Sequence, residues 1–220
     1  HKGHITIGVT SRFGLRMLTE IIPAYKKVFP QVTIEITESN VPTLTRMILE
    51  EGIDCAVMAL NCADAFAEEQ VSLLRKEEVL FAVPAAHGYC LRNRTGIMTR
   101  EELIHEFKDE NFMLSKKGST LRELADRIFA SAGFQPSTMC ETNSIIATRA
   151  MVAKGIGVTF IARSCVSDRE NVAYYSLNPR MYRYNALVRR KNLIQNEPER
   201  ALFQHIRGYF ERQDEDGPAD

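Results

Sequence analysis

The chain has 220 residues, of which 45% are hydrophobic and 25% are charged, a composition typical of globular proteins. A chain of this length forms one large domain or two smaller lobes, and it needs neither a disulfide nor a metal ion to bury a core. Its 28 basic and 28 acidic residues give a formal net charge of zero, which argues against nucleic-acid binding by this chain alone and against a polybasic membrane-binding surface.

Strands and helices alternate through the first part of the sequence. The run at 54–60 is almost continuously apolar, which is typical of a parallel strand covered on both faces. Pro23 interrupts a helical stripe of apolar residues, and we expect it to kink that helix or to begin its second part. The expected elements are a strand at 5–9, a helix at 15–29, a strand at 32–36, a helix at 42–51 and a strand at 54–60.

The alternation continues to the end of the sequence. Thr120 and Glu123 have the spacing of a capping box at a helix start, and residues 85–98 are expected to form a loop. The further expected elements are strands at 72–74, 78–83, 112–114, 138–140, 158–161, 172–177 and 184–188, and helices at 101–107, 121–132, 143–154 and from Asn196 onward. Repeated strand–helix–strand units predict an α/β protein with mostly parallel sheets.

Polar turns follow strands of this pattern at four places. They are Thr10-Ser11-Arg12, Glu38-Ser39-Asn40, residues 115–120 and residues 141–144. Sheets of this kind bind ligands beyond the carboxyl ends of their strands, so these turns hold the candidate binding residues. Hydroxyl and backbone N–H groups at a helix N-terminus favour an anion. The alternative role of the same side chains is ordinary helix capping.

The turn at 115–120 contains Gly118 and opens a helix, as a phosphate-binding loop does. It lacks the GxxxxGK[ST] order of a nucleotide-binding P-loop. A small carboxylate or oxyanion is therefore favoured over a nucleotide.

Catalytic and metal-binding patterns are missing from the sequence. The five histidines have no ligand spacing, and Asp54 is interpreted as a cap. Gly155 and Gly157 lack the GxGxxG order and are interpreted as a helix C-cap and a close backbone approach. We therefore expect no enzyme activity, no cofactor and no metal. Five cysteines without a CxxC pair, and the lack of an apolar leader, predict reduced thiols in a cytoplasmic protein.

Several of these segments together resemble the effector-binding domain of LysR-type transcriptional regulators. The family's opening strand–helix–strand is similar to the runs ITIGVTS at 5–11 and VTIEI at 32–36. Its G-x-D-x-x-[IVL] strand start is similar to GIDCAV at 52–57, and its P-x-x-H-P-L segment is similar to PAAHGY at 84–89. Its L-V-A-A-G-L-G-V-T-L-L segment is similar to MVAKGIGVTFI at 151–161.

The resemblance implies the type-2 periplasmic-binding-protein fold, in which two Rossmann-like α/β subdomains are joined by two crossover strands. The crossings are expected near Val83 and Tyr184, so that subdomain I is 1–83 plus 185–220 and subdomain II is 84–184. The four polar turns would face one another across a cleft between the lobes. The family's winged helix-turn-helix reader precedes this domain and is absent from this chain.

The resemblance also implies a function and a site. The family's effector contacts carry over onto Thr10, Ser11, Arg12, Phe13, Ser39, Asn40, Ser115, Thr142 and Asn143. A small, anionic metabolite bound there would control DNA binding and transcription allosterically. The expected partners are a second copy in a homodimer or homotetramer, through the helices at 15–28 and 121–132, and DNA through the missing reader; no membrane partner is expected.

Two other functions suit the same fold. A solute-binding protein of a transporter would share the architecture but would be exported. An enzyme would need an acid and a base, or a nucleophile, in the cleft. A helix-turn-helix encoded upstream of this segment would favour the regulator.

Overall fold

The chain forms two compact units in the computed structural model. The structure describes residues 3–10, 12–62 and 65–215, except for the side chains of Arg12, Asp214 and Glu215. Unit 1 comprises His1–Lys76 and Tyr184–Asp220, and unit 2 comprises Glu77–Arg183. The boundaries fall inside two long strands, β4 (Val71–Pro84) and β9 (Val172–Arg189). These are the two crossover strands, and the α/β fold with two such strands agrees with the sequence-based expectation.

Each crossover strand was expected as two short strands and is instead continuous. The polar residues in the middle of β4 conceal this in the sequence, because they look like a break between apolar runs. Glu77 and Glu78 are buried there, with exposed fractions of 5% and 6%. Glu77 pairs with Arg183 of β9 at 3.0 Å, and Glu78 pairs with Arg163 at 2.5 Å. Paired in this way, the two carboxylates are tolerated in the strand interior.

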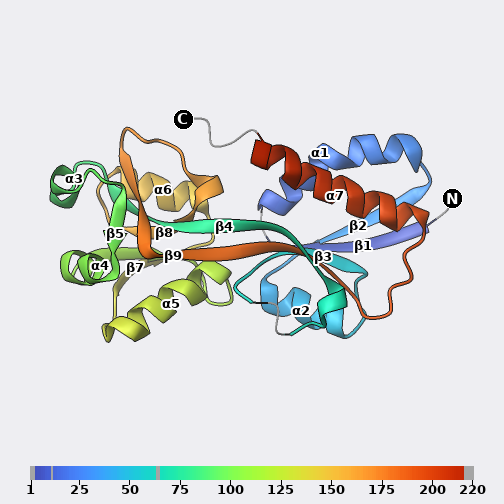
Figure 1. The fold of residues 1–220 in the computed structure, drawn as a ribbon, viewed down its shortest axis with the longest axis horizontal. Coiled ribbons are helices and arrows are strands. Elements are labelled where there is room, and N and C mark those ends of the chain that lie inside the picture. Colours follow the sequence, from blue (N-terminus) through green and yellow to red (C-terminus); the bar gives the residue numbers. More distant parts are fainter. Residues whose placement is uncertain (1–2, 11, 63–64, 216–220) are drawn as a thin grey trace. The chain divides into compact units, whose positions relative to one another are not determined.

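Unit 1 is built on three parallel strands, β1 (Gly3–Val9), β2 (Val32–Glu38) and β3 (Cys55–Leu60), in the order β2-β1-β3 with β9 antiparallel to β3. Figure 1 shows α1 (Arg12–Val28) and α7 (Glu197–Glu215) on one side of these strands and α2 (Val41–Leu49) on the other. The β1 side chains Ile5, Ile7 and Val9 pack on the α1 and α7 side. Helix α1 continues through Pro23, which therefore does not start a second helix.

Asp54 ties the strands of unit 1 together. Its Oδ2 accepts hydrogen bonds from the backbone N–H and the hydroxyl of Thr6, at 2.8 and 3.0 Å. Its Oδ1 accepts from Nε of Arg190, just beyond β9, at 3.1 Å. The interpretation of Asp54 as a simple cap is therefore wrong: it joins β1, β3 and the end of β9.

Unit 2 surrounds the crossover strands with short elements. These are α3 (Gly88–Arg92), β5 (Ile97–Thr99), α4 (Arg100–Phe107), β6 (Asn111–Leu114), α5 (Thr120–Ala132), β7 (Ser137–Glu141), α6 (Ile145–Ala153) and β8 (Thr159–Ala162), with 3-10 turns at Glu68–Gln70 in unit 1 and Arg163–Cys165 in unit 2. Strand β8 pairs antiparallel with β4, whereas β5 pairs parallel with β9 and β6 with β7.

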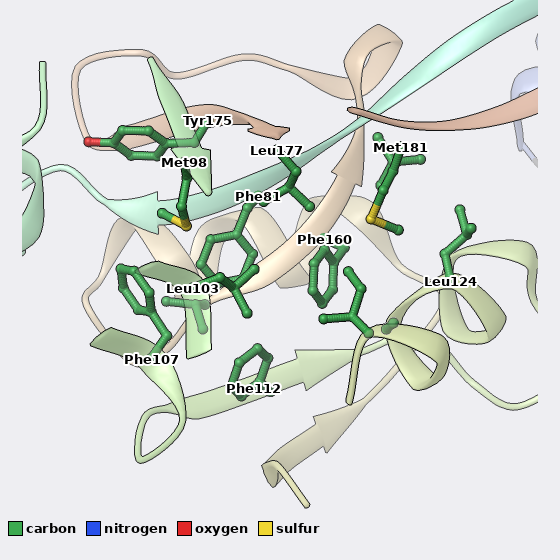
Figure 2. Close-up of a cluster of buried hydrophobic side chains, with 14 of the residues drawn as sticks. Phe81, Met98, Leu103, Phe107, Phe112, Leu124, Phe160, Tyr175, Leu177 and Met181 are labelled. Carbon is green, nitrogen blue, oxygen red and sulfur yellow. The ribbon is translucent and has the colours of Figure 1, made fainter. Parts of the chain in front are cut away.

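An aromatic cluster forms the core of unit 2. Figure 2 shows the rings of Phe81, Phe107, Phe112 and Phe160 gathered between the strands and helices. The Phe81 ring lies 5.2 Å from that of Phe107 and 5.1 Å from that of Phe160. Because β4 also buries Leu80 and Ala82 on its other face, this strand is covered on both sides.

Two local expectations in unit 2 are wrong. Residues 85–98 are not only loop, since they contain α3 and β5, whose residues Tyr89 and Met98 are buried in the core. The cap of α5 is Ser119 rather than Thr120: the Ser119 backbone is extended and its hydroxyl accepts from the N–H of Arg122 at 3.2 Å. Thr120 is already the first residue of the helix.

Gly157 confirms the expected close backbone approach. A Cβ at this position would lie 2.2 Å from the carbonyl oxygen of Asn111. Gly155 has φ +74, the left-handed conformation of a residue that follows a helix end.

Candidate functional site

The polar turns of unit 1 meet at one edge of its sheet. Strands β1 and β2 are parallel, with Val9 opposite Glu38, so the following residues Thr10 and Ser39 are neighbours. The N–H of Ser39 donates to the carbonyl of Val9 at 3.1 Å. The Thr10 hydroxyl oxygen accepts from the N–H of Ala59 in β3 at 3.3 Å. Thr10 and Ser39 are therefore brought together at the carboxyl ends of the strands.

The polar turns of unit 2 meet in the same way. Strands β6 and β7 are parallel, with Leu114 opposite Glu141. The N–H of Thr142 donates to the carbonyl of Leu114 at 3.0 Å, and the N–H of Lys116 donates to the side-chain oxygen of Asn143 at 3.0 Å. The structure thus gathers Ser115, Thr142 and Asn143 at one sheet edge.

Other predicted site residues have structural roles or lie outside the description. The Phe13 ring packs 5.9 Å from the Tyr209 ring and 5.5 Å from the Phe210 ring, which makes it part of the helix packing. Asn40 is the N-cap of α2, and its side-chain oxygen accepts from the N–H of Thr43. Ser11 and the side chain of Arg12 lie outside the described part of the chain.

The polar groups of these turns that remain available to a ligand are mostly hydrogen-bond donors. The hydroxyl oxygen of Thr142 accepts from the N–H of Ser144 at 3.0 Å, as that of Thr10 does from Ala59. Each hydroxyl therefore retains its own proton as a donor, and Asn143 retains its NH₂ group. Among the described residues, the Ser115 hydroxyl has no hydrogen-bond partner, although it is half-buried. In each unit, taken by itself, these donors suit a ligand that only accepts hydrogen bonds.

Arg122 holds the unit 2 turn in place, and sequence reasoning did not find it. Its side chain is 10% exposed, and Nη1 donates to the carbonyl of Ser115 and to Glu141, both at 3.0 Å, while Nε donates to Asp126 at 3.0 Å. Burial lowers the pKa of Arg122, but its bonds to Glu141 and Asp126 outweigh burial and raise that pKa. The arginine therefore stays charged. Its partner Glu141 is distant in sequence, so no local pattern reveals the pair.

A wide groove of about 580 Å³ runs beside α5 in unit 2. Its lining includes Lys117, Arg122, Asp126 and Phe134, but none of the nine predicted site residues. The groove therefore gives no support to the predicted site.

Within residues 3–10, 12–62 and 65–215, His, Cys, Asp and Glu side chains nowhere form a group of three or more that could hold a metal ion. In the same described part, no helix carries an apolar stretch of membrane-spanning length.

Known proteins resemble the chain over most of its length. A family model described as the LysR substrate binding domain matches residues 1–211. The probable RuBisCO transcriptional regulator of Trieres chinensis is 24% identical over 169 residues, which are 75% of this chain and 53% of that protein. The chain thus spans about half the length of the curated relatives that it matches.

Solved structures share the fold. The effector-binding domain of BenM with its effector benzoate is 21% identical, with a TM-score of 0.68, over 96% of this chain and 94% of that one. The effector-binding domain of QuiR in complex with shikimate is 20% identical, with a TM-score of 0.70, over 96% of this chain and 99% of that one.

Proposed function

The chain belongs to the LysR substrate binding domain family, and we propose that it is the ligand-sensing part of a transcriptional regulator whose effector is a small carboxylate. The family match confirms the resemblance drawn from the sequence. The matched family is regulatory rather than catalytic, and its curated relatives are transcriptional regulators, in agreement with the expectation that the chain is not an enzyme.

The observation that carries the carboxylate is the set of unused donors at the strand ends. Thr10, Ser115, Thr142 and Asn143 each keep a donor, and the acceptor atoms of three of them are already occupied by backbone N–H groups. A carboxylate accepts hydrogen bonds and donates none. Benzoate and shikimate, named with two of the structural neighbours, both carry a carboxylate.

The regulatory mechanism that we propose is allosteric. An effector shifts the equilibrium between two conformations of the regulator only if it binds them with different affinities. DNA would be bound by a winged helix-turn-helix reader outside this chain, in a cytoplasmic homodimer or homotetramer. The subdomain limits 1–83 plus 185–220 and 84–184, and the position of the ligand between the lobes, stay predictions.

A pair of serine variants tests the carboxylate site. Ser115 follows β6 at its carboxyl end, whereas Ser137 starts β7 at the opposite end of the same strand pair. One hydrogen bond to a charged ligand contributes about 1.5–3 kcal/mol, so Ser115→Ala is expected to weaken benzoate or shikimate binding about ten- to a hundredfold. Ser137→Ala is expected to leave it unchanged. Titration calorimetry compares the affinities of both variants with that of the wild type, and thermal melts compare their stabilities.

The result also separates binding from capping. The cap of α5 is Ser119, so Ser115→Ala removes no cap and should not alter the melting temperature. If neither probe nor other small carboxylates bind the wild-type chain at millimolar concentration, the proposed ligand class is wrong. Equal affinities in wild type and Ser115→Ala would place the site elsewhere.

A further inference from the structure

Unit 1 contains an apolar pocket at the carboxyl end of β3. Its volume is about 270 Å³. Leu60 of β3 lies opposite Tyr184 of β9, and Met58 lies opposite Ala186, so these side chains share the face of the sheet that α2 covers farther along. The lining is Leu60, Asn61, Cys62, Val71, Leu73, Tyr184 and Ala186.

The pocket is suited to a hydrocarbon ring. A cavity of about 150 Å³ is large enough to admit benzene, and this pocket is larger. One of its walls, Leu73, is 63% exposed, so a bound ring would remove an apolar side chain from water. Such burial stabilises a complex by about 25 cal/mol per Å² of apolar area.

Thr10 directly follows β1 and lies next to β3, whose last residue, Leu60, lines the pocket. Its hydroxyl is bonded to Ala59, the residue before Leu60. A carboxylate held by Thr10 would therefore place a directly attached group at the pocket.

We propose that this pocket holds the ring of the effector, so that the ligands of the chain are carboxylates bearing one small aromatic or alicyclic ring, with Leu73 as a specificity-determining residue. This inference deepens the proposed function and rests on it. A ring that buries about 100 Å² of apolar area should raise affinity roughly fifty- to a hundredfold over acetate.

Titration followed by methyl NMR tests the pocket directly. The probes are benzoate, cyclohexanecarboxylate, acetate and the uncharged benzyl alcohol. Both ringed acids are expected to shift the methyl resonances of Leu60, Leu73 and Ala186. Leu73→Ser is expected to weaken the ringed acids about tenfold and to leave acetate binding unchanged. Leu91→Ser is the matched control, because Leu91 is 65% exposed on α3 in the other unit.

The outcomes separate the pocket from the proposed function. Ringed acids that bind no tighter than acetate, or that respond equally to Leu73→Ser and Leu91→Ser, overturn the ring pocket while the carboxylate function stands. If benzyl alcohol shifts the pocket methyls but no acid binds, the ring site is supported and the carboxylate is not. If no ringed probe shifts the pocket methyls at millimolar concentration, the ring pocket is wrong even where acetate binds.

Discussion

Gly157→Ala is expected to destabilise unit 2 strongly. The added Cβ would lie 2.2 Å from the carbonyl oxygen of Asn111 and 2.9 Å from the Met113 sulfur. The Asn111 carbonyl has little freedom to move, because it accepts from the N–H of Val158 at 2.9 Å, and the N–H of Met113 donates to the Val158 carbonyl at 3.0 Å. Relief of the overlap would break this bridge between β6 and the chain before β8.

The magnitude follows from the bonds at risk. The loss of two backbone hydrogen bonds costs about 1 kcal/mol for each bond. A forced shift of the core costs about 1–3 kcal/mol more. Together they lower the free energy of unfolding by about 3–5 kcal/mol. For a domain of this size that is a fall of roughly 10 °C in melting temperature. Circular-dichroism melts and urea titrations measure both.

Gly88→Ala is the matched control for this substitution. The atom nearest to its added Cβ is the mobile end of Arg92, at 3.5 Å, and Gly88 is the first residue of α3. Alanine is a better helix former than glycine, so this variant should melt at or above the wild-type temperature. A Gly157→Ala protein that melts within about 1 °C of wild type would refute the reasoning, because a shift that small corresponds to well under 1 kcal/mol.

Three further outcomes are expected. Asp54→Asn should lower the free energy of unfolding by about 1–3 kcal/mol in urea titrations, because the carboxylate that accepts three hydrogen bonds loses its charge; an unchanged midpoint would contradict this. Burial and the charge of Glu199 raise the pKa of Tyr25 from 10.0 to about 12. The folded chain then keeps a phenol proton that the unfolded chain releases, so stability should fall as the pH rises from 10 toward 12, and Tyr25→Phe should flatten that fall. Ser119→Ala should lose about 1 kcal/mol of stability with benzoate affinity unchanged; reduced affinity would show that this cap also serves the ligand.

Elements with a clear apolar period were predictable from the sequence. The strand at 5–9 and the helices at 42–51 and 121–132 correspond to β1, α2 and α5. The crossover strands were divided wrongly because their middles carry charges whose partners are remote in sequence: Glu77 pairs with Arg183 across 106 positions. A sequence pattern shows only local periodicity. A buried charged residue whose partner is distant in sequence therefore looks like part of a turn.

Positions in the candidate site were predictable, but the chemistry of each position was not. Strand register brings Ser115 and Thr142 together, as the rule for carboxyl ends of parallel strands predicts. Phe13 was included because the family resemblance implied it, yet its ring packs against α7. Only three-dimensional contacts distinguish the two uses of a side chain in the same turn.

Capping and anion binding, which sequence analysis treated as alternatives, are compatible at these turns. A capping hydroxyl uses an oxygen lone pair to accept from a backbone N–H and keeps its own proton. Thr142, in the turn before the α6 cap Ser144, uses its oxygen in the same way: it accepts from the N–H of Ser144, while its O–H has no acceptor among the described residues. The backbone bond fixes the oxygen and so orients the proton that remains. A turn that satisfies its acceptors internally therefore presents an ordered set of donors, which lowers the entropy lost when an anion binds.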